Sequence, residues 1–430
     1  MSQTNEKLLT LIRRSPSPFH AVEQLRQRLL AEGYRELRER EPWQLAPGGR
    51  YLVTRGGTAL MAFRVPAEDW RGFLLTASHC DSPTFRVKGT AAGPENYLRL
   101  SVEPYGGMIM SSWLDRPLTL AGRGIFRRRG GVESRLIYVD RDLLVIPSVA
   151  IHMNREANKH ASFDPKADLL PLLGLGEDRD ALARLAAESA GAKREDLLAL
   201  ELSLCPREPG FVGGAAGELV VSPRLDDLQC VYGCLEGFLQ TREGGNLPVY
   251  CVLDHEEVGS ATRQGADGTL LREALERICA ALGRRLPEET ADSMLLSADN
   301  AHAVHPNHPE YADSGHRPRL NGGVVIKHNA NRRYATDALA AALAEEICRR
   351  SGVPVQHYSN RPDLPGGSTL GSIANTHFSV LTADVGLAQL AMHAACETAG
   401  AEDTDHLIRA AAAFYGATLR QGEDGGYDLA

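Results

Sequence analysis

The sequence predicts an α/β fold in which one α/β domain is interrupted by a β-rich insert. Buried strands and amphipathic helices alternate in residues 1–90 and 219–430, a pattern typical of an α/β/α sandwich. Short strand-like runs and Gly-rich turns replace this alternation in residues 91–218. A chain of 430 residues is also too long for one ordinary hydrophobic core, so we expect two domains.

The N-terminal part is predicted to contain one helix and three strands. Residues 15–18, Ser-Pro-Ser-Pro, precede apolar residues at helical spacing over 19–32, and Gly33 is expected to end that helix. Strands are predicted at 50–54, 59–65 and 72–78. The last of these is apolar enough to be buried on both faces, as in a sheet covered by helices.

The insert and the C-terminal part differ in their pattern. In the insert we predict a hairpin loop at 127–131, a helical segment at 178–201, a Gly-rich boundary loop at 210–217, and strands at 109–116, 118–125 and 135–139. Beyond residue 219 strands and helices alternate again, which supports the sandwich. The strands are predicted at 249–253, 294–298, 323–326 and 378–381, and the helices at 228–240, 270–282, 337–351 and 403–419.

Composition and charge exclude several classes of protein. The net charge of −8 argues against general nucleic-acid binding, which needs a basic surface. No run approaches eighteen apolar residues and residues 1–14 show no export signal, so we expect neither a membrane span nor secretion. The eight cysteines form no Cys-x-x-Cys pair, which is typical of free thiols in a reducing compartment. A cytoplasmic location is therefore expected.

Residues of the types that bind metals follow several predicted strands. They are His79, Asp226, Glu257, Asp299 and, near the C-terminus, His393. Because strand ends in an open α/β sheet meet at one crevice, we expect these side chains to converge. Each signal is weak alone, since a Glu pair is usually a solvated loop and an Asp pair often caps a helix. Their joint occurrence after separate buried runs indicates a metal centre.

The adjacent carboxylates of Glu256 and Glu257 need a physical explanation. Two like charges at a strand end repel each other, and two nearby dications would remove that cost. The pair can then divide, with one carboxylate as ligand and the other as the base that deprotonates water. At His79, one ring nitrogen can bind a metal while the Asp81 carboxylate accepts the other ring N–H. Asp226 can bridge two cations.

Six sequence strings carry a resemblance to a known family. The chain resembles the aspartyl aminopeptidases, metallopeptidases that remove N-terminal residues with two co-catalytic metal ions. The strings with Asp-x-Glu-Glu-x-Gly and Asp-x-Ala-His-x-x-His-Pro-Asn are the most specific. The matching strings are Ser15 to Val22, Ser78 to Ser82, Pro223 to Asp227, Asp254 to Ser260, Ser297 to Asn307 and Gln389 to His393.

The resemblance implies roles for the metal-binding residues. His79 and Asp299 would bind one ion, Glu257 and His393 the other, and Asp226 would bridge them. Two zinc ions per subunit are implied, with cobalt or manganese as substitutes.

Two further residues and the assembly follow from the same resemblance. Glu256 would be the general base and Asp81 would support His79. The family also implies an inserted dimerisation domain and a homo-oligomer, a dodecamer built from dimers.

The resemblance further implies a preference for N-terminal Asp or Glu on peptides with a free N-terminus. Lys327 would face the acidic side chain, and His152 would reach the site of the partner subunit from the insert. Gly367 and Ser368 match a wall of the pocket. The chain departs from the family after His393, where Ala394, Ala395 and Cys396 replace a Ser-x-Arg segment.

Two other functions are compatible with the residues themselves. A two-metal amidohydrolase, such as a deacylase or carboxypeptidase, would recognise a carboxylate in place of a free amine. A non-enzymatic, metal-dependent assembly scaffold is the other alternative, which the altered segment after His393 makes credible.

Overall fold

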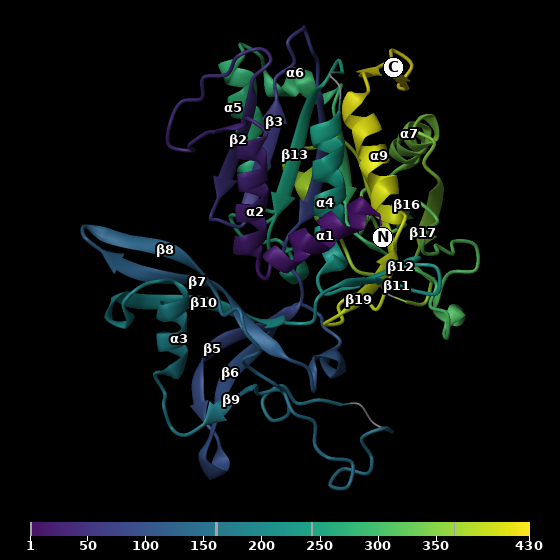
Figure 1. Cartoon of the computed structure of the whole chain (residues 1–430). Helices are drawn as coiled ribbons and strands as arrows, with labels where there is room; N and C mark the ends of the chain where they lie inside the picture. The colour runs from purple at the N-terminus through teal and green to yellow at the C-terminus, as the bar shows by residue number, and fades with distance from the viewer. Residues whose placement is uncertain (1, 160–161, 242–243, 365) are drawn as a thin grey trace.

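The structure, a computed structural model, describes residues 2–159, 162–241, 244–364 and 366–430. It has two layered parts (Figure 1). The upper part is a large sheet with helices on both faces, and the lower part is a second sheet accompanied by a single labelled helix, α3 (Ala181–Ser189). The predicted fold class, an α/β/α sandwich with a β-rich insert, is confirmed.

The larger sheet positions the predicted metal ligands. Among the described residues it has 13 strands, and its central strands β13, β4, β14 and β18 are each parallel to their neighbours in that group. Along the main path the strands are β1 (Arg35–Glu36), β2 (Arg50–Arg55), β3 (Ala59–Arg64), β13 (Leu247–Leu253), β4 (Phe73–His79), β14 (Met294–Ala298), β18 (Leu381–Leu390), β19 (Glu397–Gly400), β12 (Leu219–Ser222) and β11 (Phe211–Gly213). Beside this path lie β15 (Ala301–His302), β16 (Val324–His328) and β17 (Val355–Ser359).

Helices bury both faces of this sheet. Successive residues of β13 face opposite cores: Tyr250 packs in the core that includes α1, α2, α4, α7 and α9, and Cys251 packs in the core that includes α5 and α8. This explains why β13 and β4 are apolar runs without a polar face. The helices are α1 (Gln3–Arg14), α2 (Pro18–Ala31), α4 (Leu225–Gln240), α5 (Leu270–Ala281), α6 (Leu286–Thr290), α7 (Ala338–Arg350), α8 (Leu370–His377) and α9 (Asp403–Gly416).

The second sheet is antiparallel and has its own core. Phe85 and Trp113 meet edge to face in this core, with ring centroids 5.3 Å apart. Leu202 and Leu204 pack in the same core. Its strands, in spatial order, are β8 (Gly131–Tyr138), β7 (Leu118–Arg128), β10 (Leu197–Pro206), β5 (Thr84–Ala92), β6 (Tyr97–Tyr105) and β9 (Leu172–Leu175). A small hairpin of β20 (Leu419–Gln421) and β21 (Tyr427–Leu429) ends the chain.

Three predictions in the insert were wrong. The loop predicted at 210–217 contains β11, which belongs to the larger sheet. Residues 109–116 are not a strand, because they form a 3-10 helix at Met110–Trp113. The predicted helix at 178–201 ends at Ser189, and its last residues belong to β10. In β10, Leu200, Leu202 and Leu204 alternate with polar residues, and pairing with β7 outweighs the helix propensity of Leu and Ala.

The strand and helix limits after residue 219 also shift. The strand predicted at 378–381 begins at Leu381, and the last helix ends at Gly416. The domain limits at 90/91 and 218/219 stay a prediction; the first falls inside β5, which belongs to the second sheet. Within the described residues, no helix is both long and apolar enough to cross a membrane.

Candidate metal centre

The five predicted ligands converge at one edge of the larger sheet. His79 ends β4, Asp299 follows β14, and His393 follows β18. Glu257 lies in a short 3-10 helix (Glu256–Val258) after β13, and Asp226 lies in the first turn of α4. The carboxyl ends of parallel strands thus deliver ligands from distant parts of the sequence to one place, as the sequence predicts.

The Asp226 carboxylate lies between two imidazoles. Its Oδ1 is 3.5 Å from His79 Nε2, and its Oδ2 is 3.3 Å from His393 Nε2. Asp299 Oδ1 is 3.8 Å from His79 Nε2, and Glu257 Oε2 is 3.3 Å from His393 Nε2. Ligand atoms that share one ion at bond lengths of about 2.0–2.2 Å lie roughly 3–3.6 Å apart. Three of these four separations fall in that range. The fourth, between Asp299 Oδ1 and His79 Nε2, is slightly too long, so the Asp299 carboxylate would have to move slightly to share an ion with His79.

The donor set fits metal ions. Asp226 Oδ1, Asp227 Oδ1 and Glu257 Oε1 are buried and accept no hydrogen bond within the part of the chain that the structure describes. Such oxygens are costly to bury without a partner. In the described ranges, two groups of three side chains have ligand atoms within 4.8 Å of one another, and Asp226 belongs to both. The groups are His79, Asp226 and Glu257, and Asp226, Asp227 and Asp299.

The electrostatics show an excess of negative charge. Burial opposes protonation of His79, but Asp226, Asp299 and Asp81 together raise its pKa well above the ordinary value. Burial likewise opposes protonation of His393, whereas Asp226 and Glu257 raise its pKa to about 10. The same carboxylates that stabilise protons on the two imidazoles would provide the negative charge that a dication needs. Metal binding would displace those protons.

Left-handed backbone accompanies three of the ligand segments. His393 has φ of 68°, Arg224, two residues before Asp226, has φ of 58°, and His255, two residues before Glu257, has φ of 62°. This region is uncommon for residues other than glycine and costs about 1–2 kcal/mol per residue. Such conformations gather at functional sites, where the surrounding fold holds them. Here they turn the chain sharply after a strand so that the next side chains enter the centre.

Asp81 is bound on several sides. Its carboxylate accepts the N–H groups of Glu256 at 3.1 Å and Glu257 at 3.2 Å, and the Tyr105 hydroxyl at 2.7 Å. His79 Nδ1 lies 3.0 Å from the main-chain oxygen of Asp81 and 3.4 Å from its carboxylate. The main chain of Asp81 is therefore the nearer partner of the imidazole, and the carboxylate orients the Glu pair.

Glu397 connects two ligand segments. One carboxylate oxygen accepts the His393 N–H at 2.8 Å, and the other accepts the Asp226 N–H at 3.0 Å. The side chain of Glu397 is buried. The loop after His393 therefore has a carboxylate support, although the Ser-x-Arg segment of the resembled family is absent.

The second sheet also holds the His393 loop. His393 Nδ1 donates to the Gly107 carbonyl at 2.7 Å, which leaves Nε2 for the centre. The Ile109 N–H donates to the His393 carbonyl at 3.0 Å, and the Ala395 N–H donates to Ser112 Oγ at 2.9 Å. Sequence reasoning missed Tyr105 and Gly107, because neither stands in a metal-binding string.

The predicted substrate-binding residues differ in burial: Lys327 is buried, whereas His152, Gly367 and Ser368 are exposed. Lys327 is only 2% exposed, and its ammonium donates to the Asp299 carbonyl at 2.8 Å, Asp299 Oδ2 at 3.2 Å and the Asn300 carbonyl at 3.2 Å. Its three protons thus have acceptors within the chain. Gly367 and Ser368 are exposed just before α8, and His152 is exposed in the insert.

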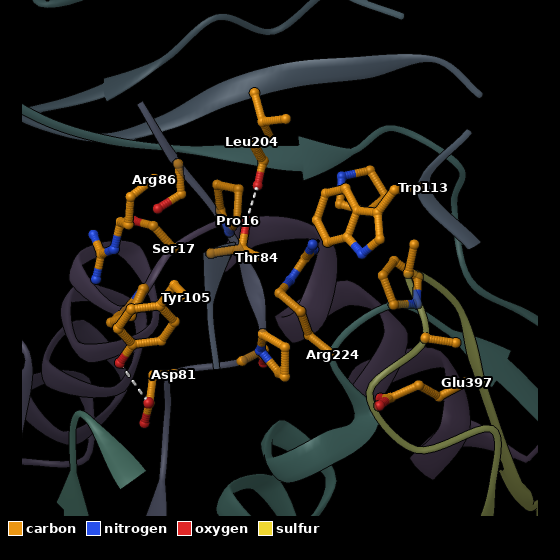
Figure 2. Close-up of a pocket in the computed structure, with 18 of the residues that line it drawn as sticks. Pro16, Ser17, Asp81, Thr84, Arg86, Tyr105, Trp113, Leu204, Arg224 and Glu397 are labelled. Carbon is orange, nitrogen blue, oxygen red and sulfur yellow. Dashed lines mark hydrogen bonds between the residues drawn. The ribbon is translucent and has the colours of Figure 1, made fainter. Parts of the chain in front are cut away.

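A cavity of about 40 Å³ lies between the second sheet and the ligand segments (Figure 2). Asp81, Tyr105, Trp113, Arg224 and Glu397 are among its lining residues, and the Tyr105 hydroxyl points to the Asp81 carboxylate. A cavity of this size has room for a few water molecules.

Comparison with known proteins identifies the family. A family model described as aminopeptidase I zinc metalloprotease (M18) matches residues 11–415. The chain belongs to this family. It is thus a zinc-dependent aminopeptidase, a hydrolase that acts on peptides.

Relatives of this M18 aminopeptidase support the assignment. A probable M18 family aminopeptidase 2 of Clostridium acetobutylicum is 38% identical over 423 residues, which cover 95% of this chain and 98% of the relative. The cryo-EM structure of the Ape4 and Nbr1 complex has a similar chain, with a TM-score of 0.93, 32% identity, and coverage of 96% of this chain and 85% of that one. The structure of the S. cerevisiae mApe1 dodecamer gives a TM-score of 0.85 and 28% identity, with 96% of each chain covered.

Proposed function

We propose that this M18 aminopeptidase holds two zinc ions at the described centre. Asp226 would bridge them, with His79 and Asp299 on one ion and Glu257 and His393 on the other. The observation that supports this most is the Asp226 carboxylate, whose two oxygens face different imidazoles at 3.5 and 3.3 Å. Cobalt or manganese could replace zinc, since both accept nitrogen and oxygen ligands.

We propose that Glu256 is the general base. When bound, the ions would supply Lewis acidity that polarises the scissile carbonyl. Glu256 lies beside the ligand Glu257, belongs to neither three-residue ligand group among the described residues, and has its N–H fixed by Asp81. Its carboxylate takes a proton from the attacking water and later gives that proton to the departing amine.

The variant Glu256→Gln tests this role. It keeps the shape of the side chain and removes its basicity, so zinc content should equal that of the wild type while kcat falls about 100-fold or more. Glu288→Gln, at an exposed carboxylate of α6, is the matched control and should leave both quantities unchanged. Near-normal turnover in Glu256→Gln would remove Glu256 from the mechanism, and lost zinc would make it a ligand.

We propose further that the substrate is a peptide with a free, acidic N-terminal residue. Lys327 supports this as a buried cation beside Asp299, and a substrate carboxylate would bind it by replacing one of its present acceptors. Gly367 and Ser368 would line the pocket. The test compares kcat/KM for Asp, Glu, Leu and Lys amides, with N-terminally blocked peptides as controls. A preference for Leu would refute the acidic preference, and cleavage of blocked peptides would indicate a deacylase.

We also propose that the chain assembles as a homododecamer built from dimers, in which His152 reaches the site of a partner. A dodecamer is the state of the similar S. cerevisiae mApe1, and His152 is exposed on the insert. Light scattering of the zinc-loaded protein tests the assembly, and a monomer would refute it. A reducing, cytoplasmic location agrees with the eight cysteines, all of which are free.

A further inference from the structure

Three histidines gather at the edge of the larger sheet, outside the zinc centre. His328 ends β16, and His357 lies on the paired strand β17. His328 Nε2 and His357 Nδ1 are 3.0 Å apart. His316 lies near His328, with ring centroids 6.5 Å apart. The proposed peptidase mechanism uses none of these three side chains.

The separation of the two nitrogens suits a shared transition-metal ion. Without an ion, it is a hydrogen bond in which one ring donates to the other. Two imidazole nitrogens at about 2.1 Å from one ion would be roughly 3.0 Å apart at a right angle and roughly 3.4 Å apart at a tetrahedral angle. An ion could therefore replace the shared proton, which would move to the second nitrogen of the donor ring, with a shift of a few tenths of an ångström.

Carboxylates lie at the opposite ring nitrogens of two of these histidines. Glu345 Oε2, on α7, is 3.8 Å from His357 Nε2, and Asp313 Oδ1 is 3.1 Å from His316 Nδ1. The hydrogen bond to Asp313 would leave Nε2 of His316 as an electron-pair donor to an ion. The Glu345 carboxylate, at ion-pair distance, would favour the proton of His357 on Nε2 and so leave Nδ1 for an ion. A carboxylate behind a metal-binding histidine fixes the ring and increases its basicity. The two carboxylates also make the cluster attractive to cations.

Two of the rings are accessible to an ion, and burial favours the neutral form of the third, His328. The side chains of His357 and His316 are 37% and 45% exposed, so a hydrated ion can reach them. Burial, followed by the neighbouring rings of His357 and His316, lowers the pKa of His328. At neutral pH His328 therefore keeps a free electron pair, as a metal ligand must.

We propose that His328 and His357 form a second metal site, for Zn²⁺ or another transition metal that prefers imidazole, with His316 as its third ligand. Such ions favour nitrogen ligands of this kind. Among the described residues, the groups of three ligand atoms within 4.8 Å of one another all lie at the zinc centre, and the three histidines do not form such a group. His316 must therefore rotate toward His328 and His357 when the ion binds. The ion would join β16 to β17 one residue away from Lys327, which holds Asp299.

Zinc binding to the assembled, zinc-loaded enzyme tests this proposal. The protein is equilibrated with a graded excess of Zn²⁺, desalted under matched conditions and analysed for zinc per chain. Wild type should carry one ion more than His328→Gln and His357→Gln. Glu345→Gln should keep the site but weaken it about tenfold, because it removes only the carboxylate behind His357. His308→Gln is the matched control, since His308 is an exposed histidine with its own carboxylate at 2.9 Å.

The decisive quantity is the difference in zinc content per chain between the wild type and the variants His328→Gln and His357→Gln. Equal zinc content in wild type, His328→Gln and His357→Gln would refute the site, and so would an equal loss in His308→Gln. The zinc centre contributes equally to all of these proteins. An error in the proposed peptidase centre would therefore change the total for every protein and leave the difference intact.

Discussion

Replacing Glu397 with Gln should weaken zinc binding without touching any ligand. The substitution preserves shape but exchanges one acceptor oxygen for an NH₂ group. In the wild type both oxygens accept main-chain N–H groups, from His393 at 2.8 Å and from Asp226 at 3.0 Å. In the variant one of these N–H groups must face another donor inside a buried site.

The magnitude follows from those two hydrogen bonds. A hydrogen bond to a charged group contributes about 1.5–3 kcal/mol, and a neutral one about 0.5–1.5 kcal/mol. Gln keeps one neutral bond and leaves one buried N–H without an acceptor, so the loss is about 3 kcal/mol. If this loss falls on the ion-bound state, zinc affinity drops about 100-fold, since about 1.4 kcal/mol corresponds to a factor of ten.

Competition with a chromogenic chelator measures the affinity. Glu402→Gln is the control, because Glu402 is an exposed carboxylate near the same segment. Excess zinc should restore most of the activity of Glu397→Gln, since Glu256 and the ligands remain. Wild-type zinc affinity together with a wild-type free energy of unfolding would refute the idea that Glu397 ties the two ligand segments together.

Three other perturbations have outcomes set by the structure. Tyr105→Phe removes the 2.7 Å hydrogen bond to Asp81 and should lower the free energy of unfolding by about 2 kcal/mol, measured by chemical denaturation. Burial, and then the charge of Arg224, lowers the pKa of His20 to about 4. Because this folded pKa lies below the unfolded value of about 6.5, the wild type loses stability as pH falls from 6.5 toward 4; His20→Gln should lose less between pH 7 and 5. Chelation should abolish peptidase activity and lower the Tm, because the buried carboxylates then repel one another, and added zinc should reverse both; an unchanged Tm would contradict this.

The convergence of most of the candidate ligands could be predicted from sequence because they lie at or just after the ends of strands. His79, Glu257 and Asp299 each follow a short apolar run, and the parallel pairing of β4, β13 and β14 brings those ends together. A strand buried on both faces is recognisable from composition, and the direction of its neighbours follows from the α/β class.

The residues that sequence reasoning missed depend on the second sheet. Tyr105 ends β6, and Gly107 lies in the connection to β7, yet both bind groups of the larger sheet. Nothing local marks such a contact, because the partner of Gly107 is 286 positions away in the chain. The 3-10 helix at Met110–Trp113 has the same origin. Its segment is bound to the His393 loop through Ile109 and Ser112, so it does not join a sheet.

These contacts connect the second sheet, through Tyr105 and the β6–β7 connection, to the candidate metal centre. His393 reaches Asp226 and Glu257 with Nε2 only while Gly107 accepts its Nδ1–H, and Asp81 holds the Glu pair with help from Tyr105. A change in the position of the second sheet would therefore act on both proposed ions, through His393 on one and through Asp81 and His79 on the other. If subunits associate through this sheet, as the resemblance to the family implies, assembly and zinc affinity are coupled, and each changes the other by the same factor.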